Sequence, residues 1–267
     1  RVDRRQRQMC IRDSYKYPAT TLTDSIANDL FFVPEVIGVK IALGDHRSSF
    51  PTTQQVLAVL AEVRVGAMIA GKTGFLHIHT GNIPGAFEMY DEILAKGFPI
   101  KHIRPTHCGR IRHVFDSAVE FGKKGGWIDI TTGASCCFDH PAQAVIEAVG
   151  MGVDPTHITL STDGHGSVPR FNEKGEMVGL GVGGVDGNLK ETIRLISDYK
   201  MPIEQALLFT TKNVGDALGL KDQGRVEVGA CANACLFTED FNLTHVVARG
   251  RVMMLDGEVV VKGTFEI

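Results

Sequence analysis

Short runs rich in Val and Ile recur along the first two thirds of the chain, separated by longer segments whose apolar residues follow a helical period. We predict buried strands over 36–43, 75–80, 101–107, 127–132 and 157–163. Helices are predicted between them, over 52–71, 86–97, 111–126 and 140–152. Strands that alternate with helices indicate βαβ units and a parallel sheet. The pattern alone leaves both a (β/α) barrel and a doubly wound sheet open.

The pattern changes towards both ends of the chain. The first fourteen residues, RVDRRQRQMCIRDS, have no apolar period, and we interpret 1–14 as a non-native or disordered leader. An α/β domain is predicted over 15–218, and it becomes mainly helical from about residue 187. Over 219–267 the β-branched residues and the Asp256-Gly257 pair predict a small β unit with a hairpin.

One charged residue interrupts the first predicted strand. In VIGVKIAL, Lys40 would carry an ammonium into an apolar environment, which costs several kcal/mol unless the charge is neutralised. Three more polar residues end later strands, namely His79, His107 and Asp163. The C-terminal ends of parallel strands are where α/β proteins place their active sites. Each residue alone has an ordinary explanation, such as a hydrogen-bonded histidine or a lysine that extends to the surface.

Together, the four residues predict a metal centre. Imidazole and carboxylate are ligands that zinc selects. A deprotonated lysine amine can add CO₂ and become a carbamate, which is an anionic ligand with two oxygens. Such a group could bridge two metal ions about 3.5–4 Å apart. Carboxylation would therefore explain why a lysine is placed in this strand.

The order Lys, His, His, Asp resembles the amidohydrolase superfamily. The segments VIGVKIALGDHRSSFP, RPTHCGRIRHVF and LSTDGHGSVPRF resemble the isoaspartyl dipeptidase family within it, and the resemblance extends over nearly all of 15–267. It implies an α/β fold, a partial TIM-like (β/α) barrel of the metal-dependent hydrolase type, with a small C-terminal β unit.

The resemblance also implies roles for individual residues. Lys40 would be the carboxylated lysine that bridges two zinc ions, and His79 and His107 would bind the second of them. Asp163 would bind zinc and act as the general base for the bridging hydroxide. The implied contacts with substrate are Tyr15 as oxyanion donor, Arg47 and Arg110 as partners of the substrate carboxylates, and Ser167.

One part of the family pattern is missing. His77 and His79 imitate its His-x-His pair, but that pair belongs on the first barrel strand, before the lysine. We interpret His77 as a packing or supporting residue. We expect the chain to be a fragment without the first three barrel strands, and inactive as it stands.

The expected function is zinc-dependent hydrolysis of β-aspartyl (isoaspartyl) dipeptides. Two alternatives stay open: another amidohydrolase, such as a dihydroorotase-like cyclic-amide hydrolase, and a non-catalytic homologue that acts as a scaffold or binding module. A substrate panel would distinguish the first alternative from the dipeptidase. The missing His-x-His pair favours the second alternative. A phosphate-binding barrel is weaker because no glycine-rich phosphate loop follows a strand.

The composition of the chain limits the kinds of partner that the protein is expected to bind. The formal net charge is −3, which gives no reason to expect a nucleic acid or a membrane surface. No run of about 18 apolar residues exists, so no transmembrane helix is expected. Six scattered cysteines are interpreted as reduced thiols of a cytoplasmic protein. The expected partners are a small dipeptide substrate and, by the resemblance, further copies of the chain in a homo-oligomer.

Overall fold

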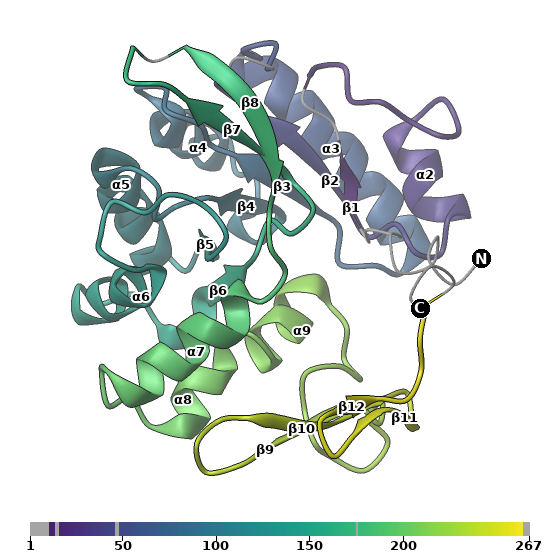
Figure 1. Cartoon of the computed structure of the whole chain (residues 1–267). Coiled ribbons are helices and arrows are strands. Elements are labelled where there is room, and N and C mark those ends of the chain that lie inside the picture. The colour runs from purple at the N-terminus through teal and green to yellow at the C-terminus, as the bar shows by residue number, and fades with distance from the viewer. Residues whose placement is uncertain (1–10, 14–15, 46–47, 175, 264–267) are drawn as a thin grey trace.

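An arc of parallel strands with helices around it forms the main part of the chain (Figure 1). The computed structural model describes residues 11–13, 16–45, 48–174 and 176–263. The strands of the arc are β1 (Ile11–Asp13), β2 (Gly38–Ala42), β3 (Phe75–His79), β4 (Ile103–Thr106), β5 (Ile128–Thr131) and β6 (Ile158–Ser161). Strands β1 to β4 form one parallel sheet and β5 pairs with β6 in another. The backbone amide of Cys108, after β4, donates to the carbonyl oxygen of Asp129 in β5, at 3.0 Å.

Helices follow most strands, as the alternating pattern predicts. They are α2 (Ile26–Phe32), α3 (Thr53–Ala70), α4 (Ala86–Ala95), α5 (Arg112–Lys123), α6 (Pro141–Gly150), α7 (Gly187–Ser197), α8 (Ile203–Leu208) and α9 (Lys212–Leu218). Short 3₁₀ turns, η1 (Ile100–His102) and η2 (Pro155–His157), precede β4 and β6. The order of strands and helices confirms the predicted partial (β/α) barrel.

The two faces of the strands differ in polarity. Val39, Ile41, Leu76 and Ile78 alternate along β2 and β3 and are buried in the apolar core with residues of the helices. The residues between them are polar: in the parallel register Lys40 lies opposite His77, and His77 lies opposite Arg104. Because side chains alternate along a strand, these three face the interior of the arc. Lys40 therefore interrupts an apolar run in sequence without entering the apolar layer.

Helix α3 bears on the expectation that the chain has no transmembrane helix. Among the described residues, it is long and apolar enough, by length and composition alone, to cross a membrane. We expect no such segment because the sequence has no run of about 18 apolar residues, but the mean hydropathy of this helix is 1.2. Val56, Leu60 and Val63 are fully buried within the apolar core. We interpret α3 as a core helix on this evidence.

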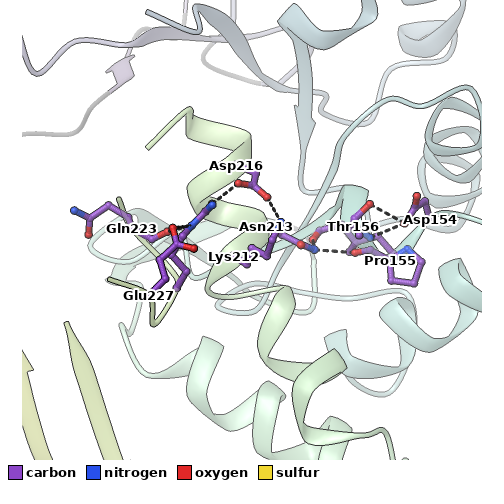
Figure 2. A network of polar contacts seen from close by, with 10 residues as sticks. Asp154, Pro155, Thr156, Lys212, Asn213, Asp216, Gln223 and Glu227 are labelled. Atoms are coloured by element: carbon purple, nitrogen blue, oxygen red, sulfur yellow. Dashed lines mark hydrogen bonds and ion pairs between the residues drawn. The ribbon is translucent and has the colours of Figure 1, made fainter. Parts of the chain in front are cut away.

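Helix α9 is fastened to the turn that starts β6 (Figure 2). The side-chain amide of Asn213 donates to the carbonyl oxygens of Pro155, at 2.7 Å, and Ile158, at 2.8 Å. Asp216 pairs with Lys212 on the same helix and with Arg225 beyond it. These contacts hold α9 against the N-terminal end of β6.

Two antiparallel units complete the fold. A hairpin of β7 (Ser167–Phe171) and β8 (Met177–Val182) follows β6 and was not predicted. The C-terminal sheet has the order β12-β11-β10-β9 and contains β9 (Ala234–Phe237), β10 (Leu243–Ala248), β11 (Arg251–Leu255) and β12 (Glu258–Val259). Asp256 and Gly257 join β11 to β12 with positive φ angles of 51° and 84°, so the predicted hairpin is confirmed. Within the leader predicted over 1–14, residues 11–13 form β1.

Candidate metal centre

Four predicted ligands come together at the C-terminal ends of the strands. The Nζ atom of Lys40 lies 3.7 Å from Oδ1 of Asp163, and Nε2 of His107 lies 3.9 Å from Oδ2 of the same aspartate. The rings of His79 and His107 meet edge to face, with centroids 4.6 Å apart. Three βα segments separate Lys40 from Asp163 in sequence, so this convergence is a product of the barrel arrangement.

Unusual backbone angles aim two of these residues. His107 and Asp163 have φ angles of 62° and 50°, in the left-handed region that few residues other than glycine adopt. Each comes one or two residues after the end of its strand, β4 or β6. The turn at Asp163 is fixed by the amide of Gly166, which donates to the Asp163 carbonyl oxygen at 2.9 Å. Backbone strain of this kind often accompanies functional sites.

Two loops meet closely beside the centre. Gly81 follows β3 with a φ angle of 73°, and a Cβ atom there would lie 2.0 Å from the carbonyl oxygen of Gly44, which follows β2. Only glycine allows this backbone contact. It brings the loop after β2 next to His79.

The environment of His107 favours a neutral imidazole. Its Nδ1 atom is 2.6 Å from the hydroxyl of Thr131 in β5. Burial, with a smaller contribution from the charge of Arg110, lowers the pKa of His107 well below its usual range. When Nδ1 donates to Thr131, Nε2 presents its lone pair to the side where Asp163 lies. This is the tautomer and the orientation that a metal-binding histidine requires.

His79 has an acidic neighbour that our sequence interpretation left without a role. Its Nε2 atom lies 3.5 Å from Oδ2 of Asp45, and both side chains are largely buried. Asp45 belongs to the quoted LGDHR segment, directly after the strand of Lys40, and that position was the available signal. His77 lies two residues before His79 in β3, so its side chain points to the same side of the strand. Burial and the charge of Lys40 lower its pKa to about 3.

The donor set fits a metal ion in its chemistry. Neutral imidazole and carboxylate suit zinc, and ligand atoms around a tetrahedral zinc stand about 3.4 Å apart, close to the separation of His107 from Asp163. Across the described ranges, however, no three His, Cys, Asp or Glu side chains are grouped closely enough to hold an ion together. The residues therefore match zinc in the types of ligand atom and in the spacing of one pair, His107 and Asp163. Lys40 lies beside that pair.

The predicted substrate contacts are only partly described. Tyr15 and Arg47 lie outside the described residues, and of Ser167 only the backbone is described, at the start of β7. Arg110 lies at the edge of the centre, where its amide donates to the His107 carbonyl oxygen at 3.1 Å. The substrate-binding roles of all four residues stay predictions.

A buried carboxylate below the centre was missed. Asp129 in β5 accepts hydrogen bonds from the hydroxyls of Thr106, at 2.5 Å, Thr159, at 2.7 Å, and Ser161, at 2.6 Å. It thereby connects β4, β5 and β6 inside the arc. The signal was the same as for Lys40, namely one charged residue within the apolar segment GGWIDITTG.

The fold is the barrel type of the metal-dependent hydrolases, and the chain belongs to the amidohydrolase family, whose model matches residues 72–253. Members of this family are generally metal-dependent. The chain is similar to the β-aspartyl dipeptidase of Fervidobacterium islandicum AW-1 in its complex with β-Asp-Leu. The identity is 34% and the TM-score 0.86, over 94% of this chain and 65% of that one.

Two further structures extend the comparison. A second structure of the same Fervidobacterium enzyme gives 31% identity and a TM-score of 0.83, with the same coverage. A D-hydantoinase gives a TM-score of 0.59 at 14% identity over 89% of this chain, which shows a shared fold alone. The present chain thus spans 65% of the length of the β-aspartyl dipeptidase chains that it matches.

Proposed function

We propose that this protein acts in the zinc-dependent hydrolysis of β-aspartyl dipeptides, at the centre that contains Lys40, His79, His107 and Asp163. The observation that carries the proposal is the convergence of these side chains at the strand ends of a chain 34% identical to a β-aspartyl dipeptidase. Family membership alone supports a hydrolase of unspecified substrate.

The residues that would hold zinc are His79, His107, Asp163 and a carboxylated Lys40. The Lys40 ammonium first loses a proton, and the neutral amine then forms a nitrogen–carbon bond with CO₂ and releases a second proton, so a cationic side chain becomes an anionic ligand. Carboxylation also removes the cost of an ammonium in this largely buried position. When bound, zinc lowers the pKa of water and polarises a carbonyl group.

Asp163 is the proposed proton carrier. Amide hydrolysis requires a base that takes a proton from the attacking water and an acid that returns it to the leaving amine. The Asp163 side chain is 34% exposed, more than Lys40 or His107, so it can face both the substrate and the centre. Its oxygens lie 3.7 Å from Nζ of Lys40 and 3.9 Å from Nε2 of His107, so the carboxylate is close to both proposed ligands.

Carboxylate recognition would give the substrate preference. A β-aspartyl dipeptide has two free carboxylates, one from the aspartyl residue and one at the C-terminus. Arginine binds carboxylates in a two-pronged geometry, and we assign this task to Arg110 together with Arg47. A site that pairs both carboxylates should reject cyclic amides that lack one of them.

The test combines zinc binding with a matched pair of substrates. Metal-free protein is titrated with zinc in a calorimeter, and leucine release is followed from β-Asp-Leu and from its α-linked isomer. We expect zinc to bind, and any leucine release to come from the β-linked substrate alone. Asp163→Asn should abolish leucine release. Asp186→Asn, which removes an exposed carboxylate paired with Lys190 outside the centre, should not.

One observation keeps a second candidate in view. Because no three ligands of the usual types are grouped among the described residues, a non-catalytic homologue that binds the dipeptide is the alternative. Saturable binding of β-Asp-Leu without leucine release, at saturating zinc, would favour that binding role. Equal cleavage of both isomers, or cleavage of dihydroorotate instead, would contradict the proposed specificity.

A further inference from the structure

A cavity of about 190 Å³ lies inside the arc below the candidate metal centre, and its lining extends from Phe75 and Trp127 to His77 and Ser161. Its walls include Phe75 at the start of β3, Trp127 just before β5, and Val214, Ala217 and Leu218 of α9. Strand β3 runs from Phe75 in the cavity wall to His79 in the centre. At about 3.3 Å per residue the two places are roughly 13 Å apart. None of the four proposed metal ligands lines the cavity, although His77 in its wall is two residues from His79.

An unbalanced cation lines this cavity. Arg104 in β4 is only 7% exposed, and its guanidinium carbon lies 5.4 Å from the ring centroid of Phe75 and 4.8 Å from that of Trp127. Its Nε and Nη1 atoms are buried, and no described residue offers them a hydrogen-bond acceptor. A buried guanidinium without a counter-charge is costly, and aromatic faces offset only part of that cost.

The nearest acidic group does not meet this need. Asp129 also lines the cavity, but its oxygens accept the three hydroxyl groups of Thr106, Thr159 and Ser161. Among the residues that the structure describes, no carboxylate lies within ion-pair distance of Arg104. Burial lowers the pKa of Arg104 to about 9, so the side chain is still a cation at neutral pH. A bound anion would supply the counter-charge that the Arg104 guanidinium lacks among the described residues.

We propose that this cavity binds a small monocarboxylate with an apolar body, with Arg104 as the partner of the carboxylate. The size suits a compound such as benzoate, because an apolar cavity of about 150 Å³ accommodates benzene. The aromatic and aliphatic walls suit the apolar body, and guanidinium suits the planar carboxylate. Inorganic phosphate matches this site less well, since it would place several charged oxygens against Phe75, Leu218 and the Asp129 carboxylate.

The first measurement compares two ligands of similar size on the unaltered protein. Benzoate and benzyl alcohol are titrated separately in a calorimeter, with zinc removed by a chelator. We expect benzoate to bind saturably at one site per chain, and benzyl alcohol to bind at least about tenfold more weakly, because a hydrogen bond to a charged group is lost. This comparison requires no variant to fold. Absence of saturable benzoate binding, or equal binding of the two ligands, would overturn the proposal.

Variants then locate the site. Arg104→Met should weaken benzoate binding by about tenfold or more, and Val214→Phe should block it by filling the cavity. Arg112→Met is the matched control, since Arg112 is an exposed arginine paired with Asp116 on α5. It should leave the affinity unchanged. Benzoate affinity should also persist at saturating β-Asp-Leu. Competition with the dipeptide, or full affinity in Arg104→Met, would assign the binding to another place.

Discussion

The ammonium of Lys40 and the carboxylate of Asp163 face each other across the interior of the arc, 3.7 Å apart. Lys40 comes from β2 and Asp163 from the segment after β6, so the contact joins distant parts of the barrel. Because Lys40 faces this interior and not the helices, a lysine is tolerated within the run VIGVKIAL. The pair has two chemical states to distinguish, an ion pair and a carbamate ligand.

Replacing Lys40 with arginine separates the two states. Lys40→Arg keeps a cation that can pair with Asp163, but a guanidinium does not form the carbamate. We expect Lys40→Arg to lower zinc affinity by about 10–100-fold or more, as much as Lys40→Met does, because both lose a ligand. Calorimetric zinc titrations of the three proteins measure this. Near-normal zinc binding in Lys40→Arg would show that the lysine acts only through its charge.

The hydroxyl of Thr131 should matter for metal binding through His107. Thr131→Val keeps the size of the side chain and removes the partner of Nδ1, so the imidazole loses its fixed tautomer. We expect zinc affinity to fall by about 10–100-fold. Thr132→Val is the matched control, because Thr132 bonds with Asn188 and the Ser161 carbonyl oxygen instead. Equal zinc affinities in the two variants would argue against this supporting role.

Sequence patterns predicted the elements that have a strong local signal. The buried strands, the helices between them and the Asp256-Gly257 turn were all found, with ends shifted by at most three residues. The hairpin β7–β8 was missed because its strand residues are interrupted by glycines and charges and are largely exposed along β8. Helix α2 is short and gave no clear period.

The candidate site shows a similar division. Polar and charged residues within or at the ends of apolar strands marked Lys40, His79, His107 and Asp163 before any geometry was known. Arg104 was missed because nothing in the sequence tells which charged strand residue finds a partner. Asp45 and Thr131 were missed because their importance depends on contacts between separate βα units. These partners become visible only when the strands are placed side by side.

Asp129 should stabilise the arc by joining three strands. In Asp129→Asn an amide nitrogen replaces one carboxylate oxygen and cannot accept the hydrogen bonds made there, which are either that of Thr159 or those of Thr106 and Ser161. We expect the free energy of unfolding to fall by about 1.5–3 kcal/mol, the usual effect of losing hydrogen bonds to a charged group. Denaturant titration measures this, with Asp116→Asn on the exposed side of α5 as control. Equal stability of the two variants would contradict the bracing role of Asp129.

His77 should make stability depend on pH in an identifiable window. Its folded pKa is about 3, against an ordinary value of 6.5, chiefly because burial disfavours the charged imidazole. Below pH 6.5 the unfolded chain therefore takes up a proton that the folded chain refuses. The associated stability is fully present above pH 6.5 and is lost as the pH falls towards 3. The slope is about 1.4 kcal/mol per pH unit for one proton.

A neutral substitute isolates this contribution from those of the other histidines. His77→Gln keeps a polar side chain that does not titrate, so its free energy of unfolding should fall less steeply than that of the unaltered protein between pH 6.5 and 4. Denaturant titrations are made with a chelator present, because metal binding would add its own pH dependence. His113→Gln, at an exposed position on α5, is the control and should follow the unaltered protein. Parallel curves for all three proteins would show that His77 is protonated equally in the folded and unfolded chains. The half-buried place opposite Lys40 would then have no effect on its charge, contrary to the desolvation that its position implies.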